Sequence, residues 1–385
     1  MRYKFLELGE ANAPFADAIK EALVRVVDSG RYIGGDEVSG FEARLAEIHG
    51  VEAEAVIGVS NGLDALRLIL RGYIELGRLN PGDGVIVPAN TYVASVLAIT
   101  DSGLRPVFVD PDSATHNLDT ARAMEACGPD VKAVMPVHLY GRVCWELRLD
   151  EMARDRGLIV IEDNAQAIGA KAVCDGMYGS RMTGTLGHAA AFSFYPTKNI
   201  GAMGDAGAVM TRDSGLAAVV RALRNYGSLH RYENIYAGLN CRLDPMQAAV
   251  LGVKLPHLAA ENALRAANAR VYEATIHNPA VIKPLYSEAG DCVWHQYVVR
   301  VADRDSFRRY MADNGVETAV HYPVAPHCQP CYEAYRSVSL PVAERLASEV
   351  VSLPVSRCTS AEDAAAIARI VNRYDGKPLL FRNND

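Results

Sequence analysis

Short apolar runs alternate with helix-like patterns between about Gly58 and Met210. Each run is followed by Gly, Pro, Asn or Asp, which is typical of strands that turn out of a sheet. Strands separated by helical stretches indicate crossover connections, and therefore a mostly parallel sheet. The predicted strands are residues 55–59, 85–88, 106–110, 133–137, 158–163, 190–194 and 207–210.

Apolar residues recur every three or four positions over 36–49 and over 61–73, so each segment predicts an amphipathic helix. After Thr211 the pattern changes to long helices, including 244–276 with a break at Pro256.

The C-terminal part of the chain mixes both patterns. Residues 294–301 predict a strand, and 306–314 and 361–374 predict helices. We therefore predict an α/β fold, with a large domain over 1–250 and a smaller C-terminal α+β domain over 251–385.

Length and composition fit this organisation. The chain has 385 residues, of which 50% are hydrophobic and 22% charged, as in globular proteins of two packed units. The net charge of −7 argues against a general partner of nucleic acid or of an anionic membrane. Charges at Lys4, Glu7 and Glu10 interrupt the N-terminus, and long apolar runs are missing. We expect a soluble, cytoplasmic protein with reduced cysteines.

The cysteines suggest one metal-like motif. Cys328 and Cys331 lie close together in HCQPC, shortly after His321 and His327. This is half of a zinc site, and a second ligand pair with matching spacing is absent, so we predict ordinary thiols and no metal. The other cysteines stand singly among apolar residues and are expected to be small buried side chains. They are Cys127, Cys144, Cys174, Cys241, Cys292 and Cys358.

Polar residues follow three of the predicted strands, at the edge of a parallel sheet where ligands bind. The segment 59–66, VSNGLDAL, leads from a strand into a helix whose N-terminus could hold a phosphate, although Asn-Gly is also an ordinary turn and cap. Asp163 ends a buried strand and suits either a protonated pyridine nitrogen or a helix N-cap.

The third strand end carries a lysine. Lys198 lies in a Gly-rich loop, where desolvation would lower its pKa and allow a Schiff base with an aldehyde. The alternative is a solvated loop lysine. Ser193 could add a hydroxyl to a phosphate site. Together the three strand ends match the phosphate, the pyridine nitrogen and the aldehyde of pyridoxal 5'-phosphate.

These motifs also resemble a known family. From residue 32 to residue 327, and above all in FSFYPTKNIGAMGDAGAV, the sequence resembles the fold-type-I aminotransferases of the DegT/StrS kind, which act on nucleotide-linked keto-sugars. The resemblance implies that Lys198 forms the Schiff base with the cofactor and moves the proton. It also implies that Asp163 pairs with the ring nitrogen and that Gln166 lies near the ring hydroxyl.

Further cofactor contacts follow from the same resemblance. Ser193 and the backbone of Gly62 and Leu63 would hold the phosphate, although many relatives have Thr where Leu63 stands. Tyr92 would stack on the ring. Asn240 would reach the phosphate of the neighbouring subunit, which implies a homodimer with shared active sites.

The resemblance places four residues on the substrate side. Tyr32, Tyr322 and His327 would lie near the sugar. Arg242 would pair with the substrate diphosphate or, equally, form a structural ion pair.

The subgroup implied is the one that transfers an amino group from L-glutamate to C3 of a dTDP-3-keto-6-deoxyhexose. NGLDALRLIL, PANTYVAS and FYPTKN carry this resemblance, whereas Thr197 departs from the expected Gly. Lys198 argues against the dehydratases of the family, which carry His there. The alternatives are amination at C4 and a non-catalytic regulator that binds the cofactor. A nicotinamide dehydrogenase would need G-x-G-x-x-G after the first strand, which VSNGLDAL does not supply.

Overall fold

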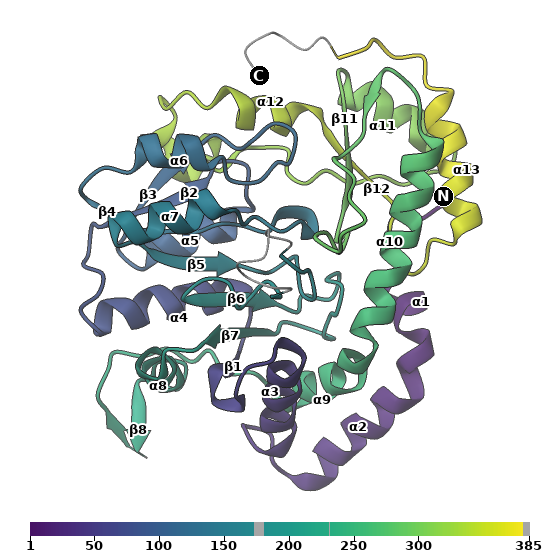
Figure 1. The fold of residues 1–385 in the computed structure, drawn as a ribbon. Coiled ribbons are helices and arrows are strands. Elements are labelled where there is room, and N and C mark those ends of the chain that lie inside the picture. Colours follow the sequence, from purple (N-terminus) through teal and green to yellow (C-terminus); the bar gives the residue numbers. More distant parts are fainter. Residues whose placement is uncertain (173–180, 231, 380–385) are drawn as a thin grey trace.

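A computed structural model describes residues 1–172, 181–230 and 232–379. Its centre is a seven-stranded sheet in the order β1-β7-β6-β5-β4-β2-β3 (Figure 1). β7 runs antiparallel to both of its neighbours and the other pairs are parallel, so the predicted mostly parallel sheet is confirmed. The strands are β1 Val56–Val59, β2 Gly84–Pro88, β3 Arg105–Val109, β4 Val131–Val134, β5 Ile159–Asp163, β6 Ala189–Ser193 and β7 Gly207–Thr211.

Helices cover both faces of this sheet. Because successive side chains of a strand point to opposite faces, Ile57 packs in one core cluster and Val56 in another. The first cluster includes α4, α5 and α8; the second includes α3 and α9, and a third on the same face includes α6 and α7. These helices are α3 Asp36–His49, α4 Gly62–Glu75, α5 Val93–Asp101, α6 Thr120–Ala126, α7 Leu147–Arg156, α8 Ser214–Leu223 and α9 Pro245–Lys254.

The helices predicted at 36–49 and 61–73 are confirmed as α3 and α4. The predicted break at Pro256 is also confirmed, because a 3-10 turn, Leu255–His257, separates α9 from α10, Leu258–Thr275. Two N-terminal helices, α1 Leu8–Asn12 and α2 Ala16–Ser29, were not predicted.

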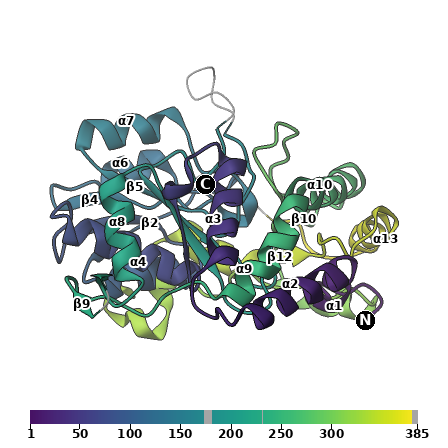
Figure 2. The same cartoon turned by 90° about the horizontal axis from the view of Figure 1, so that it is seen from below.

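A second, antiparallel sheet packs beside α10 (Figures 1 and 2). Its core cluster also contains Tyr3, from the other end of the chain. The boundary predicted at residue 250 falls inside α9, and the division into two domains stays a prediction. The elements here are β10 Val281–Ile282, β11 Tyr297–Val301, α11 Arg304–Asp313, α12 Pro341–Glu349, β12 Val350–Leu353 and α13 Ala361–Asn372.

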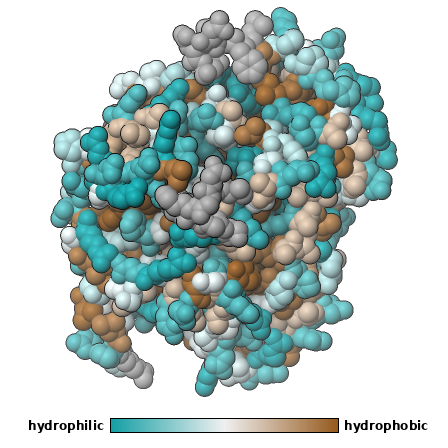
Figure 3. Space-filling model, in the orientation of Figure 1, coloured by the Kyte–Doolittle hydropathy of each residue, from teal (hydrophilic) through white to brown (hydrophobic). Residues whose placement is uncertain are grey.

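The surface carries one small hairpin and a mixed distribution of polar and apolar residues. A small hairpin, β8 Ser228–His230 with β9 Glu233–Asn234, projects beside α8 (Figure 1). Hydrophilic and hydrophobic residues are interspersed over the face seen in Figure 3. Within the described ranges, every helix is too short or too polar to cross a bilayer.

Most of the predictions for the single cysteines are confirmed, since Cys127, Cys144, Cys241 and Cys292 are buried. Cys358 is half-buried. Cys174 lies outside the described residues.

Candidate active site at the strand ends

The strand register brings the predicted site residues to one edge of the sheet. Asp163, the last residue of β5, lies opposite Ala191 of β6, and Ser193 ends β6 two residues later. Ser193 in turn lies opposite Gly207, which also pairs with Val59 at the end of β1. Residues far apart in the sequence therefore meet at this edge.

Asp163 is buried and hydrogen-bonded. Its Oδ2 accepts a hydrogen bond from Ser95 Oγ at 2.7 Å, and its Oδ1 accepts one from the backbone N–H of Ala165 at 3.2 Å. Ser95 Oγ also lies 2.7 Å from Thr91 Oγ1. Because Ser95 donates its only hydroxyl proton to Asp163, Thr91 donates to Ser95, and this chain fixes the orientation of the carboxylate.

A second buried carboxylate, that of Glu162, precedes Asp163 at the end of β5. Glu162 Oε2 lies 2.9 Å from His138 Nε2, and its two oxygens also accept three backbone N–H groups from 184–187. His138 Nδ1 accepts the N–H of Cys144, so its proton is on Nε2 and donates to Glu162. The backbone N–H of His138 donates to the carbonyl of Asp163, which anchors the end of β5.

Lys198 lies in the loop between β6 and β7. Burial lowers the pKa of its amine to about 8, and the negative charge of nearby Asp163 partly opposes this shift. The next residue, Asn199, anchors the loop, since its Nδ2 donates to Asn262 at 2.8 Å and to the carbonyl of Val293 at 3.0 Å. The amine is therefore held near Asp163 with a pKa that suits proton transfer near neutral pH.

The start of α4 forms a tight cradle with the end of β6. A Cβ on Gly62 would lie 2.7 Å from the Cβ of Ser193, so only glycine fits there. Asn61 caps the helix by accepting the N–H of Asp64 at 2.8 Å. The first N–H groups of a helix have no partner within it, so Gly62 and Leu63 present donors beside the Ser193 hydroxyl. This is a suitable site for a phosphate.

Gln166, three residues after Asp163, contacts two tyrosines. Its side-chain oxygen accepts the N–H of Tyr140 at 2.7 Å, and its amide donates to Tyr322 Oη at 3.0 Å. The Tyr322 ring lies 5.0 Å from that of Tyr92, which precedes α5 and is 52% exposed. Tyr322 therefore lies between Gln166 and the exposed Tyr92.

Comparisons with known proteins show the family of this chain. A model of the DegT/DnrJ/EryC1/StrS aminotransferase family matches residues 15–372. The chain belongs to this family.

Curated relatives of this aminotransferase are similar over nearly their whole length. The dTDP-3-amino-3,6-dideoxy-alpha-D-galactopyranose transaminase of Aneurinibacillus thermoaerophilus is 45% identical over 96% of this chain and 99% of its own. The dTDP-3-amino-3,4,6-trideoxy-alpha-D-glucose transaminase of Streptomyces venezuelae is 43% identical over 92% of this chain and 91% of its own.

A solved structure shows the same fold. The crystal structure of S. venezuelae DesV in complex with a ketimine intermediate aligns with a TM-score of 0.90 at 41% identity. The alignment covers 96% of this chain and 98% of that one.

Three predicted site residues of the aminotransferase contact residues other than Lys198. Asn240 is exposed and pairs with Asn225 through an isolated β-bridge. Arg242 donates to Asn225 Oδ1 at 3.0 Å, and its guanidinium lies 5.4 Å from the centre of the Tyr226 ring. Tyr32 is 57% exposed and donates its hydroxyl to the carbonyl of Val27.

The two histidines of HYPVAPH occupy different environments. His321 Nδ1 lies 2.7 Å from Ser352 Oγ, and burial together with the charge of Lys198 lowers its pKa to about 4, so it is neutral. His327 is fully buried, with its ring 5.9 Å from that of Phe108. A sugar contact through His327 therefore needs the side chains around it to move.

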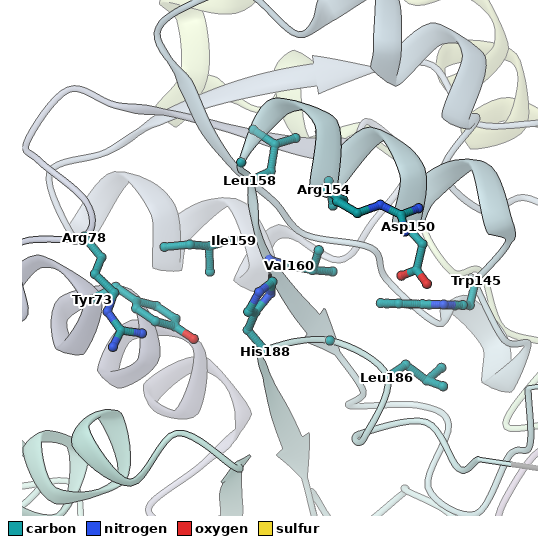
Figure 4. A pocket seen from close by; sticks show the side chains of 13 residues that line it. Tyr73, Arg78, Trp145, Asp150, Arg154, Leu158, Ile159, Val160, Leu186 and His188 are labelled. Atoms are coloured by element: carbon teal, nitrogen blue, oxygen red, sulfur yellow. Dashed lines mark hydrogen bonds between the residues drawn. The ribbon is translucent and has the colours of Figure 1, made fainter. Parts of the chain in front are cut away.

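A cavity of about 550 Å³ lies at the opposite edge of the sheet (Figure 4). It is lined by the start of β5, by His188 just before β6, and by Tyr73, Arg78 and Trp145. A strand of five residues spans roughly 13 Å between its first and last Cα atoms, so this cavity is separate from the Asp163 edge.

The residues that hold Asp163 were not predicted. Ser95, Thr91 and His138 carry no local motif, and only the fold brings them near a carboxylate at the end of β5. The available signal was that a buried Asp163 needs a donor partner.

Proposed function

We propose that this chain is a pyridoxal-phosphate-dependent aminotransferase that moves the amino group of L-glutamate to C3 of a dTDP-linked 3-keto-6-deoxyhexose. The products are the 3-amino sugar and 2-oxoglutarate. The observation that carries the proposal is the half-buried Lys198, whose amine feels the charge of Asp163 at the sheet edge, in a family of sugar aminotransferases. The two curated relatives named above act on dTDP-3-amino sugars, which supports C3.

The residues at the sheet edge fit the three polar groups of the cofactor. Gly62 and Leu63 N–H groups with Ser193 would hold the phosphate, and a side chain at position 62 would fill that space. Asp163 would pair with the ring nitrogen, Gln166 would lie by the ring hydroxyl, and Tyr92 would cover a ring face. When bound, pyridoxal phosphate supplies an electron sink for the bond broken at the amino-acid Cα.

Lys198 performs the proton transfers. Its Nζ takes the proton from Cα of glutamate, and in the second half-reaction it delivers a proton to C3 of the sugar. A pKa of about 8 leaves a useful fraction of the amine neutral at working pH while keeping its protonated form a competent acid. Ser95 and the backbone N–H of Ala165 hold the Asp163 carboxylate in one orientation, so the site needs little rearrangement.

The pKa of Lys198 gives a pH prediction for the protein without cofactor. At pH 7.5 an amine of pKa about 8 is roughly one-quarter neutral, compared with about one part in a thousand for an ordinary lysine. We expect the rate of pyridoxal phosphate capture to rise with pH and to level off above about 8, as followed by visible absorbance. A rate that keeps rising toward pH 10 would contradict the low pKa.

The substrate side is proposed to use Tyr32, Tyr322 and Arg242, whereas the predicted sugar contact of His327 would require the side chains around its buried ring to move. Tyr322 has the strongest support, because it lies between Gln166 and Tyr92. Burial raises the pKa of Tyr322, so its hydroxyl stays protonated and can donate a hydrogen bond. In the part of the chain that the structure describes, Arg242 contacts the neutral side chains of Asn225 and Tyr226, which leaves its charge available to a diphosphate.

We further propose a homodimer with shared active sites, in the cytoplasm. Asn240 is exposed and follows the β8–β9 hairpin by six residues, which supports a contact with a neighbouring subunit. Several large side chains that are hydrophobic or aromatic are about half exposed, and a dimer interface would cover them. They include Tyr92, Tyr195, Met203, Tyr226 and Leu229.

The position of amination is tested with a substrate panel. Purified enzyme with L-glutamate and separate dTDP-3-keto and dTDP-4-keto sugars is expected to yield an amine at C3 only, located by NMR of the product. Formation of 2-oxoglutarate in equal amount would confirm the donor.

The alternatives give different results in the same assay. An amine at C4 would overturn the position but keep the family activity. A product that loses a hydroxyl without gaining nitrogen would indicate a dehydratase. A protein that becomes yellow with cofactor but converts no substrate would indicate a regulator.

A further inference from the structure

The HCQPC motif gains a third partner in the folded chain. His327 and Cys328 lie in a 3-10 turn, Pro326–Cys328, which packs beside α12. From α12, Glu344 places Oε1 at 3.3 Å from His327 Nε2, and Cys328 Sγ lies 3.3 Å from the same nitrogen. The three candidate ligand atoms all lie within 4.8 Å of one another.

The separation of His327 Nε2 from Glu344 Oε1 suits a shared cation better than a strong hydrogen bond. A nitrogen-to-oxygen hydrogen bond is usually about 2.9–3.0 Å long, shorter than the 3.3 Å found here. Two ligand atoms bound to zinc at about 2.1 Å with tetrahedral angles lie roughly 3.4 Å apart. The His327 and Glu344 atoms therefore have the spacing of two zinc ligands, and Cys328 Sγ lies close enough to be a third.

The chemistry of the cluster points the same way. His327 Nε2 faces a carboxylate oxygen and a sulfur, both of which can share a metal ion with it once the thiol has lost its proton. His327 is fully buried, and Nε2 is the ring nitrogen that lies beside these two atoms. Imidazole, thiolate and carboxylate together are the ligands of zinc rather than of magnesium or calcium.

We propose that His327, Cys328 and Glu344 bind one zinc ion, with a fourth position open to water at the exposed side of Glu344. The backbone N–H of Leu340 donates to Glu344 Oε1 at 3.1 Å, which orients the carboxylate as outer-shell donors do in metal sites. The ion would tie the 3-10 turn to α12. Its ligand His327 follows Tyr322 by five residues. This differs from the expectation of ordinary thiols, because the third ligand comes from a residue that the motif does not contain.

The test uses the purified holoenzyme, stripped of metal by chelator dialysis and then titrated with zinc alone. We expect one zinc per chain by elemental analysis, and a rise in the thermal midpoint as zinc is added. Cobalt in place of zinc should give visible bands of a tetrahedral thiolate complex, at longer wavelength than the cofactor absorbs. Cys328→Ser and Glu344→Gln should each weaken zinc binding at least tenfold, measured by competition with a chromogenic chelator.

Matched variants separate this site from adventitious binding. Cys331→Ser and Glu333→Gln alter exposed residues of the same types nearby and should bind zinc like the parent. The proposal is overturned if the parent holds no stoichiometric zinc, or if Cys328→Ser and Glu344→Gln bind it as tightly as the parent. Because the readouts are metal content and affinity, the result is independent of whether the proposed transamination occurs.

Discussion

Replacing Lys198 by alanine is expected to lower the rate of transamination by about 10²–10⁴-fold. The variant loses the amine that is proposed to move the proton at Cα of glutamate and at C3 of the sugar, and whose pKa is lowered by burial. The rate is measured as 2-oxoglutarate formed with a saturating keto-sugar. Near-complete loss with an unchanged circular dichroism spectrum is the expected result.

Lys132→Ala is the control for this substitution, because Lys132 is an exposed lysine whose amine contacts only the carbonyl of Pro129. It should turn over like the parent. If Lys198→Ala kept more than a few per cent of the parent rate, another group would have to carry the proton, and the assignment of Lys198 would be wrong.

Replacing Asp163 by asparagine is expected to lower the rate by about 10²–10³-fold, as for the loss of one oriented electrostatic partner in a buried site. Asparagine keeps the shape of the side chain but removes the charge that is proposed to pair with a protonated ring nitrogen. It also leaves Ser95 facing a neutral amide. Turnover and the absorbance spectrum of the bound cofactor are measured together, because a loss of ring protonation changes both.

Asp313→Asn serves as the matched control, since Asp313 is an exposed residue at the end of α11. Its rate and spectrum should equal those of the parent. A parent-like spectrum and rate for Asp163→Asn would show that the ring nitrogen is paired elsewhere.

Much of the fold is predictable from local patterns. The sheet strands were predicted to within two or three residues at their ends, because buried parallel strands are apolar runs with turn residues behind them. The helix at 36–49 was predicted with its observed bounds, since its apolar stripe ends at Gly50, which adopts a left-handed conformation as a C-cap. The three strand-end residues Asp163, Ser193 and Lys198 were found for the same reason.

Residues that act through long-range contacts were not predictable. Ser95 reaches Asp163 across 68 positions, and Glu344 reaches His327 across 17. Neither pair leaves a pattern in the sequence, because the spacing is set by how α5 packs on the sheet and how α12 packs on the 3-10 turn. The helix α2 was missed although its buried residues Ile19, Ala22 and Val26 follow helical spacing.

The strand order of the large sheet bears on how the protein folds. Val59 pairs with Gly207, so β1, the first strand made, joins the sheet only after β7 exists. Closing such long loops is slow, and it leaves a sheet edge exposed in the meantime. Because Gly62 follows β1 by three residues and lies against Ser193, the phosphate cradle is complete only when β1 has paired with β7. Capture of the coloured cofactor during refolding would thus report that this long-range pairing has formed.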